Sequence, residues 1–598
     1  MKLSAIGPLV LAVGLFATAC GPAGSPAASG GAATTAPATA AQGTSAPATQ
    51  STPAAAQATT APAGAGAQAT TTSATTGAQA TAAPAGAGAQ PTVAATTAAQ
   101  TTAAGKPIKG GQLVVATQRD ATTFDPNKSQ DVYSNDILSL VSDTLFEIDN
   151  KGQVVGRLVD KTENPEPNVY VFTLKSGIKF QDGTPLDSAA VKFNLERQIN
   201  DPSSTNSQDV KPITDIQTPD PQTVQITLSA PFAPFTSRLT SGAGFILSPT
   251  AIQKLGDNLQ RDLTGAGSGP FKFVSWEPDN QIILERNPDF WGKDADGTQL
   301  PYLDKVIFKP FPDENVRLTN LKTGDADAMA GNPPPSQIDS LLQSPDLTST
   351  EIPGLGFQFV DLNTSKPPFD NPAVRRALAY AIDRSQINQT VNFGHGVPLA
   401  LPVPPSVPWA FVKNTQYDAR DIDKAKQELA SAGVSNVSFT MQISNASPML
   451  QQVAELMKDQ IKDAGFDMDI QLIEFATVVA NGNSGAYDAL CLGWSGSVDP
   501  DGNMYPLLYS GAGFNFAKYS NPAMDKALDD GRTNLDQAAR AKAYTDAQTI
   551  LLQDQPMLVL YSQSQVASAR KNVQNYPNNY NGWFGGRDIY KAWVTQGT

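Results

Sequence analysis

The residues best suited to bind a small molecule lie in the segment LGWSGSVDP, from Leu492 to Pro500. The apolar run Ala489 to Leu492 predicts a strand that leads into it, and the end of a strand is where an open α/β sheet presents ligand groups. An indole, hydroxyls and carboxylates at such a place predict a ligand-binding loop. The candidate ligand-binding residues are Trp494, Ser495, Ser497, Asp499 and Asp501. The alternative is that Trp494 packs beneath the loop and that both aspartates only form its turn.

Catalytic and metal chemistry find little support in the sequence. The chain has one histidine, His395, which lies between two glycines and is expected in a loop. A Ser/His/Asp triad elsewhere and a multi-histidine metal site are therefore excluded. The segments starting at Asp294 and Asp499 resemble the opening of a calcium loop, but Lys305 and Ser510 stand at the twelfth positions, where a bidentate glutamate belongs. We expect turns there, with no metal, no cofactor and no enzymatic activity.

A strand, a turn and a helix are predicted in succession between Val169 and Gln198. Aromatic and β-branched residues alternate from Val169 to Leu174, and the pair Asp182-Gly183 supplies turn chemistry. Asp187 can cap the helix that follows. Its apolar residues at helical spacing are Val191, Leu195 and Ile199.

Further helices are predicted to begin at Pro372, Pro448 and Pro522, and the first and third follow an asparagine that can cap them. Gly465 can end the second helix. The strand predicted after it has the alternating residues Met468, Ile470 and Leu472. Strands interleaved with helices indicate mixed α/β lobes.

The segment Val169 to Gln198 closely resembles the signature of the peptide/nickel class of ABC-transporter solute-binding proteins, family 5, which includes the oligopeptide- and dipeptide-binding proteins. Four further segments agree with this family in the same order along the chain: Gly110–Pro126, Gly267–Gly292, Asn363–Arg384 and Lys518–Arg532. The resemblance covers the chain from about residue 109 to its end. It implies an α/β fold of the periplasmic-binding-protein type II class, with two lobes, a hinge and an additional domain.

The resemblance also implies a discontinuous first domain. The expected ranges are 106–145, 232–352 and 557–598 for domain I, 146–231 for domain II, and 353–556 for domain III, the second lobe.

In peptide-binding relatives the matching loop lines the cleft between the lobes, and an aspartate three residues after the tryptophan pairs with the ammonium of the peptide. Ser497 stands at that position here, and Cys491 stands where an oligopeptide-binding relative has a ligand-contacting arginine. A hydroxyl cannot replace a charge-assisted contact of a desolvated carboxylate. Asp499 or Asp501 would serve instead if the loop is shifted by a residue or two, and the ligand class stays open.

The function implied is that of a receptor that captures a peptide, or a polar solute of similar size, in an interlobe cleft and delivers it to an ABC permease. We expect it to act as a monomer. An oligosaccharide receptor of the same fold is the first alternative, because Trp494 and Trp409 could stack on sugar rings. A carboxylate-dependent extracellular hydrolase and a sensory binding module are the others, and turnover assays and neighbouring permease genes would separate them from the receptor.

The first 20 residues are typical of an export signal. Lys2 provides the positive start, an apolar stretch runs from Leu9 to Phe16, and small residues precede Cys20. The stretch is too short to remain as a membrane-spanning helix. It resembles a bacterial lipobox, which would make Cys20 the lipidated first residue of an exported protein anchored at the cell membrane. The alternative is cleavage after Ala19, which would release a soluble secreted protein.

Residues 21–105 contain no charged side chain and consist mainly of Ala, Thr, Pro, Gly, Gln and Ser. Such a composition lacks the bulky side chains that offset the entropy of ordering, so we expect a disordered tether with a reach of about 50 Å. Its threonine and proline content is also compatible with glycosylation.

The net charge of −14 and the two cysteines limit the function further. Clustered Lys and Arg, which nucleic acid and anionic lipid headgroups require, are not found, so we expect no nucleic-acid partner. Cys491 lies in an apolar run and is expected to be a buried, unreactive thiol. If Cys20 carries lipid, the chain has no disulfide and depends on burial for stability.

Overall fold

The computed structural model describes residues 105–598, apart from 130, 414–415, 580–585 and 596–598, and these belong to the unit Ala98–Thr598. The predicted signal peptide 1–20, its Cys20, and the tether 21–105 apart from Gly105 lie outside the described residues. The mixed α/β class expected from the sequence is confirmed.

A large mixed sheet runs through this unit, with the strand order β10-β11-β12-β1-β13-β19-β14-β18-β16-β17, and β15 pairs with β19. We call the part that carries β1 and β10 to β13 the first lobe, and the part that carries β16 to β18 the second lobe. The strands are β1 Gln112–Thr117, β10 Phe271–Glu277, β11 Gln281–Arg286, β12 Lys305–Pro310, β13 Ala328–Met329, β14 Leu347–Leu362, β15 Val397–Pro398, β16 Val437–Ser444, β17 Phe466–Ile473, β18 Ala489–Trp494 and β19 Met557–Arg570.

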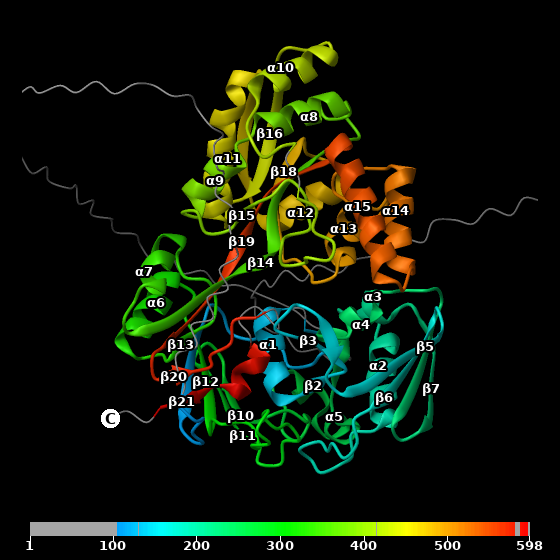
Figure 1. Cartoon of the computed structure of the whole chain (residues 1–598), viewed down its shortest axis with the longest axis vertical. Helices are drawn as coiled ribbons and strands as arrows, with labels where there is room; N and C mark the ends of the chain where they lie inside the picture. The colour runs from blue at the N-terminus through cyan, green and yellow to red at the C-terminus, as the bar shows by residue number, and fades with distance from the viewer. Residues whose placement is uncertain (1–104, 130, 414–415, 580–585, 596–598) are drawn as a thin grey trace, which may run out of the picture. The chain divides into compact units, whose positions relative to one another are not determined.

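The long strands β14 and β19 connect the two lobes (Figure 1). They pair antiparallel from Leu347 opposite Arg570 to Asp361 opposite Met557, and the register breaks between Pro353 and Phe357. A strand of 16 residues spans about 50 Å, which is enough to contribute to both lobes. The break in register lies between the part of β14 that pairs in the first lobe and the part that pairs with β18 in the second.

The first lobe also contains a four-stranded antiparallel sheet, β5-β6-β8-β7, against which α2 packs through residues such as Leu195. Its further elements are β2 Asp143–Thr144, β3 Phe146–Ile148, β4 Val154–Gly156, β5 Val159–Glu166, β6 Val169–Leu174, β7 Ile213–Asp220, β8 Thr223–Leu228, β9 Phe245–Ile246, β20 Val573–Gln574, β21 Trp593–Val594, α1 Val132–Val141, α2 Ser188–Asn200, α3 Ser207–Val210, α4 Phe235–Arg238, α5 Pro249–Leu255, α6 Glu314–Thr323, α7 Ile338–Leu342 and the short 3₁₀ helices η1 Gly242–Gly244, η2 Gly256–Gln260, η3 Pro335–Gln337 and η5 Gly586–Lys591.

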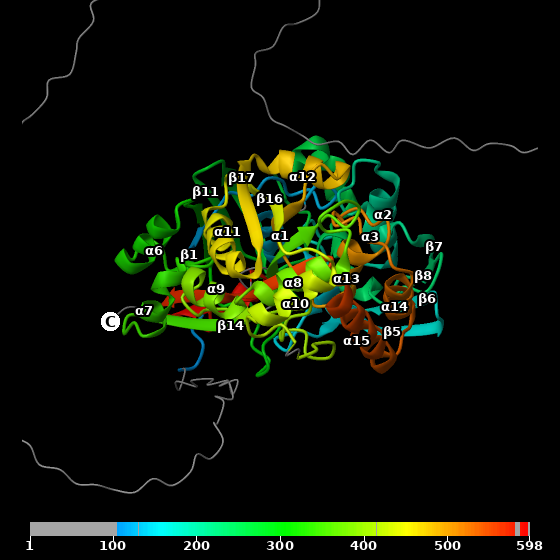
Figure 2. The same ribbon diagram turned by 90° about the horizontal axis from the view of Figure 1, so that it is seen from above.

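Helices cover the strands of the second lobe, and α14 and α15 lie side by side in both views (Figures 1 and 2). One apolar cluster packs α8 and α11 on β16 and β17, and another joins β18 to α13, α14 and α15. The helices are α8 Pro372–Ala381, α9 Arg384–Val391, α10 Ile422–Ser431, α11 Pro448–Ile461, η4 Lys462–Ala464, α12 Phe475–Ser484, α13 Pro500–Leu508, α14 Pro522–Thr533 and α15 Gln537–Asp554.

The strand and helices expected from residue patterns are confirmed, including their caps. Asp187, Asn371 and Asn521 each accept a backbone N–H in the first turn of the helix that follows. The strand expected after Gly465 is β17, but Leu472 is 48% exposed, because β17 pairs only with β16 at the edge of the sheet. Cys491 is buried in β18, as expected, and burial raises the pKa of its thiol to about 12.

Candidate functional site

A cavity of about 700 Å³ lies between the two lobes, beside the strands that connect them. The wall in the first lobe consists of residues of helix α1 and of the segment from Ser237 to Phe245, together with Ile148, Asp209, Asn332 and Arg587. Gly354, Leu355, Gly356 and Gln358 of β14 and Gln563, Ser564 and Gln565 of β19 line it where the lobes are connected, and residues 493–498 with Gly502 form the wall in the second lobe. A ligand in this cavity would contact both lobes at once.

Three of the five predicted site residues line this cavity: Trp494, Ser495 and Ser497. Trp494 is half-buried at the end of β18, and its indole Nε1 donates a hydrogen bond of 3.1 Å to the carbonyl of Gly502. Phe514 packs edge-on against the same indole, with the ring centroids 5.5 Å apart. The ring therefore has a fixed orientation and still contributes surface to the cavity.

The loop after Trp494 is held against the backbone of β14. Gly496 has a φ of +84°, and a Cβ at this position would lie 2.1 Å from the carbonyl oxygen of Leu355. Glycine is the residue that permits both this left-handed conformation and this close approach. Ser497 completes the turn by accepting a hydrogen bond on its Oγ from the N–H of Asp499 at 3.2 Å.

Asp499 and Asp501 belong to the first turn of α13, and neither lines the cavity. Asp499 caps the helix by accepting the N–H of Asp501, and Arg540 donates to both of its carboxylate oxygens, at 2.7 and 2.9 Å. Burial alone would lower the pKa of Arg540, but the carboxylate of Asp499 raises it above its usual range. Ligand binding by these aspartates therefore stays a prediction, and their present partners are arginines.

Asp501 is fully buried and forms ion pairs with both lobes. Arg532 of α14 donates to its two oxygens at 2.8 and 2.9 Å, and Arg238 of α4, in the first lobe, donates at 3.1 Å. A backbone hydrogen bond of 2.8 Å from Ala233 to the carbonyl of Arg532 joins the lobes at the same place. These contacts connect the binding loop to the first lobe beside the cavity.

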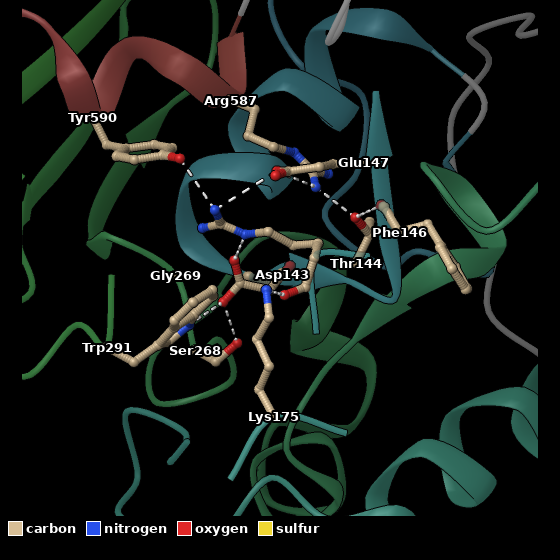
Figure 3. A network of polar contacts seen from close by, with 12 residues as sticks. Asp143, Thr144, Phe146, Glu147, Lys175, Ser268, Gly269, Trp291, Arg587 and Tyr590 are labelled. Atoms are coloured by element: carbon tan, nitrogen blue, oxygen red, sulfur yellow. Dashed lines mark hydrogen bonds and ion pairs between the residues drawn. The ribbon is translucent and has the colours of Figure 1, made fainter. Parts of the chain in front are cut away.

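A buried polar network positions Arg587, the other arginine of the cavity wall (Figure 3). Arg587 donates to the hydroxyl of Thr144 and lies 3.9 Å from Glu147, which is 3.6 Å from Arg157. Arg157 in turn donates to Asp143 at 2.8 Å. Burial lowers the pKa of Arg587, and the neighbouring Glu147 opposes this shift.

Sequence reasoning missed the polar residues of the wall outside the loop after Trp494, and two of these, Asp136 and Gln358, are nearly buried. Asp136 of α1 is 7% exposed, and Gln358 of β14 is 9% exposed, with its Oε1 accepting no hydrogen bond among the described residues. Asp136 could have been found from the sequence by the helical spacing of the residues of α1 that line the cavity. These residues are Val132, Asn135, Asp136 and Ser139. Trp409, considered for sugar stacking, does not line the cavity and packs against Tyr544.

The single histidine lies in the loop before β15, as expected, and contacts carboxylates outside the cavity wall. Its Nδ1 is 3.1 Å from Glu351, and its Nε2 is 3.6 Å from Asp339. The expected turn at Asp294 is present, with Thr298 donating its N–H to Asp296 at 2.8 Å. The turn expected at Asp499 is wrong, because Asp499 caps helix α13, which begins at Pro500. Within the residues that the structure describes, no group of three or more His, Cys, Asp or Glu could hold a metal ion.

Two α/β lobes that share two long strands and enclose a cavity between them define a two-lobed solute-binding protein. The family model "Bacterial extracellular solute-binding proteins, family 5 Middle" matches residues 153–516, more than half of the chain, and the chain belongs to this family.

Relatives of known name and structure agree with this assignment. The glutathione-binding protein GsiB of Salmonella paratyphi A is 29% identical over 477 residues, covering 78% of this chain and 91% of GsiB. The periplasmic binding protein DppA from Helicobacter pylori, solved with the peptide STSA, matches at 26% identity with a TM-score of 0.68, covering 82% of this chain and 99% of DppA. The oligopeptide-binding protein AppA from Bacillus subtilis, solved with a nonapeptide, matches at 25% identity with a TM-score of 0.65, covering 82% of this chain and 100% of AppA.

The expected type II periplasmic-binding fold and the expected role are confirmed by these similarities: the chain is a solute-binding receptor. Proteins of this family act outside the cytoplasm and are binding proteins rather than enzymes. None of the helices between residues 105 and 595 that the structure describes is both long and apolar enough to cross a membrane.

Proposed function

We propose that this receptor captures a peptide, or a polar solute of similar size, in the interlobe cavity and delivers it to an ABC permease. The observation that carries the proposal is a cavity of about 700 Å³ whose walls come from both lobes and from β14 and β19. This volume falls within the usual range of small-molecule sites, roughly 300–1,000 Å³. GsiB, DppA and AppA, which are named for or solved with glutathione or peptides, support a ligand of this class.

The mechanism we propose is a population shift without covalent chemistry. A ligand that contacts Trp494 in one lobe and α1 in the other stabilises the arrangement in which the lobes lie together. The permease would then distinguish loaded from empty receptor by the relative position of the lobes. Residues Trp494, Ser495 and Ser497 are proposed as ligand contacts, and we propose that the receptor acts as a monomer.

Ligand-dependent stabilisation tests the ligand class. We expect the melting temperature to rise with the concentration of a suitable peptide, by the equivalent of about 2.7 kcal/mol at a hundredfold excess over the Kd. Glutathione and the tetrapeptide Ser-Thr-Ser-Ala are the first probes, and maltooligosaccharides test the alternative class. Stabilisation by the sugars and not by the peptides would contradict the proposal.

A matched pair of variants tests the site. Trp494→Ala removes an aromatic ring that lines the cavity, whereas Phe475→Ala removes a 57% exposed ring on α12 that does not line it. The first variant is expected to weaken peptide binding and the second to leave it unchanged. Equal peptide affinities of both variants would contradict a ligand contact of Trp494. A lower melting temperature of Trp494→Ala with unchanged affinity would show that Trp494 packs in the hydrophobic core instead.

We further propose that a lipid on Cys20 anchors the exported protein at the membrane, because the residues before Cys20 resemble a lipobox. Cys20→Ala is then expected to move the protein from the membrane fraction to the soluble exported fraction. Unchanged partitioning into detergent would contradict the anchor.

A further inference from the structure

The cavity wall carries four charged side chains, and three of them have charged partners in the protein. Arg238 lies 3.7 Å from Asp209 and 3.1 Å from Asp501, so this arginine and Asp209 neutralise one another. Arg587 lies 3.9 Å from Glu147. The fourth charged residue is Asp136.

Asp136 is a buried carboxylate without a partner among the described residues. It lies in the middle of α1, is 7% exposed, and forms part of the cavity wall together with Asn135 and Ser139. Within the described part of the chain, no N–H or hydroxyl donates to its carboxylate, and no Lys or Arg lies within 4 Å. A buried carboxylate without a hydrogen-bond donor or a cation beside it lowers the stability of the folded protein, and a cation that approaches it removes this cost.

We propose that Asp136 binds the positively charged group of the ligand, a protonated amine such as the amino terminus of a peptide. The inference rests on the proposed function and names the charge that the ligand must carry. Asp136 would supply the negative charge that Ser497 lacks. Asp499 and Asp501, the substitutes considered from the sequence, are paired with arginines. The carboxylate approaches the ligand from the first lobe, opposite the loop that carries Trp494.

The electrostatic surroundings of Asp136 agree with this role. Burial raises the pKa of its carboxyl group well above the usual range, Asp131 at the start of α1 raises it further, and Arg587 opposes the shift. The other titratable groups nearby are the phenols of Tyr133 and Tyr576. An ammonium ion in the cavity favours the ionised carboxylate, so the proton of a protonated Asp136 passes to the solvent when the ligand binds.

Calorimetric titration tests the proposal by comparing the affinities of glutathione and of Ser-Thr-Ser-Ala with those of their N-acetylated forms. For the wild-type protein, acetylation is expected to weaken binding at least about thirtyfold, as is usual when one partner of a buried charge pair is removed. In Asp136→Asn the free and the acetylated peptide are expected to bind with similar, weakened affinity. Asp257→Asn, which removes an exposed carboxylate of the same lobe, is the control and should retain the full discrimination.

A structural role of Asp136 is separated from a binding role by the stability of the ligand-free variants. Because the carboxylate has no partner, Asp136→Asn and Asp136→Ser should melt no lower than the wild type. Earlier melting of both variants would assign Asp136 to the fold and overturn the proposal.

The remaining outcomes are also decisive. Discrimination against acetylated peptides that persists in Asp136→Asn would place the ammonium elsewhere, with Asp209 as the next carboxylate of the wall. Equal binding of free and acetylated peptides by the wild type would overturn the inference and leave the proposed function intact. Binding of no peptide would overturn the proposed function and the inference with it.

Discussion

Arg238 of the first lobe donates a 3.1 Å hydrogen bond to the carboxylate of Asp501, which lies fully buried in the second lobe. The same carboxylate accepts two hydrogen bonds from Arg532. One buried charge thus both orders the binding loop within its own lobe and connects that lobe to the other beside the cavity. The two arginines therefore have separable roles.

Arg532→Ala should destabilise the protein. The change leaves the buried Asp501 with only the interlobe contact, and removal of one partner from a buried ion pair typically costs about 3–5 kcal/mol. Lys526→Ala is the control, because its exposed i,i+4 pair with Asp530 contributes less than about 1 kcal/mol. Urea unfolding of the two variants measures the difference, and equal midpoints would contradict the importance of the Asp501 cluster.

Arg238→Gln should weaken ligand binding more than it weakens the fold. Asp501 keeps both hydrogen bonds from Arg532, and Asp209, the other partner of Arg238, is part-exposed, so the melting temperature of the free protein should fall less than in Arg532→Ala. The arrangement with the lobes together loses a charge-assisted hydrogen bond, so we expect roughly tenfold weaker binding of a peptide ligand, mainly through faster dissociation. Stopped-flow release rates equal to those of the wild type would contradict this assignment.

Gly496→Ala should disturb the binding loop. Its Cβ would lie 2.1 Å from the Leu355 carbonyl, in addition to the strain of a φ of +84°. Gly511 has a similar φ of +76° but nothing within 4 Å of an added Cβ, so Gly511→Ala carries only the backbone strain, about 1 kcal/mol. We therefore expect a large loss of ligand affinity in Gly496→Ala only, and equal titration curves would argue against the loop's tight packing on β14.

Asp361→Asn should stabilise the protein at neutral pH. Asp361 is fully buried in β14, neither carboxylate oxygen has a hydrogen-bond partner among the described residues, and burial raises its pKa well above the usual range. Because the pKa is higher in the folded than in the unfolded state, the wild type loses stability as the pH rises from the unfolded pKa through the folded pKa.

The gain from Asp361→Asn should therefore be about 1–3 kcal/mol above the folded pKa and should vanish below about pH 4, where the unfolded chain is protonated too. Chemical unfolding at several pH values measures it. Asp467→Asn, at an exposed position of β17, should show no such dependence. A gain that is independent of pH would mean that charge burial is not its cause.

The sequence predicted those parts of the fold that depend on local patterns. Alternation and capping residues located β6, α2, α8 and α14, because an N-cap and its helix lie within a few residues of one another. The family resemblance supplied the two-lobed arrangement. The exposure of Leu472 could not be predicted from local alternation, because exposure at the edge of a sheet depends on which strands pair.

The candidate site was predicted in part. Trp494, Ser495 and Ser497 follow the end of β18 in one loop and line the cavity, and their contact with a ligand stays a prediction. The partners of Asp501, however, are 31 and 263 residues away, and no local pattern reveals such pairs. Asp136 was missed because a polar stripe on a helix is ordinarily its solvated face, and only the assembled lobes turn this stripe into the wall of a cavity.

A crystal structure of the protein with a bound free-amine peptide, such as Ser-Thr-Ser-Ala, would locate both the ligand and its ammonium group. We expect the peptide in the cavity between the lobes, in contact with Trp494 on one side and with α1 on the other, and with its ammonium within hydrogen-bond distance of Asp136. A peptide bound outside this cavity, on the surface of one lobe, would contradict the proposed function, and a peptide inside it whose ammonium does not contact Asp136 would contradict the role of Asp136.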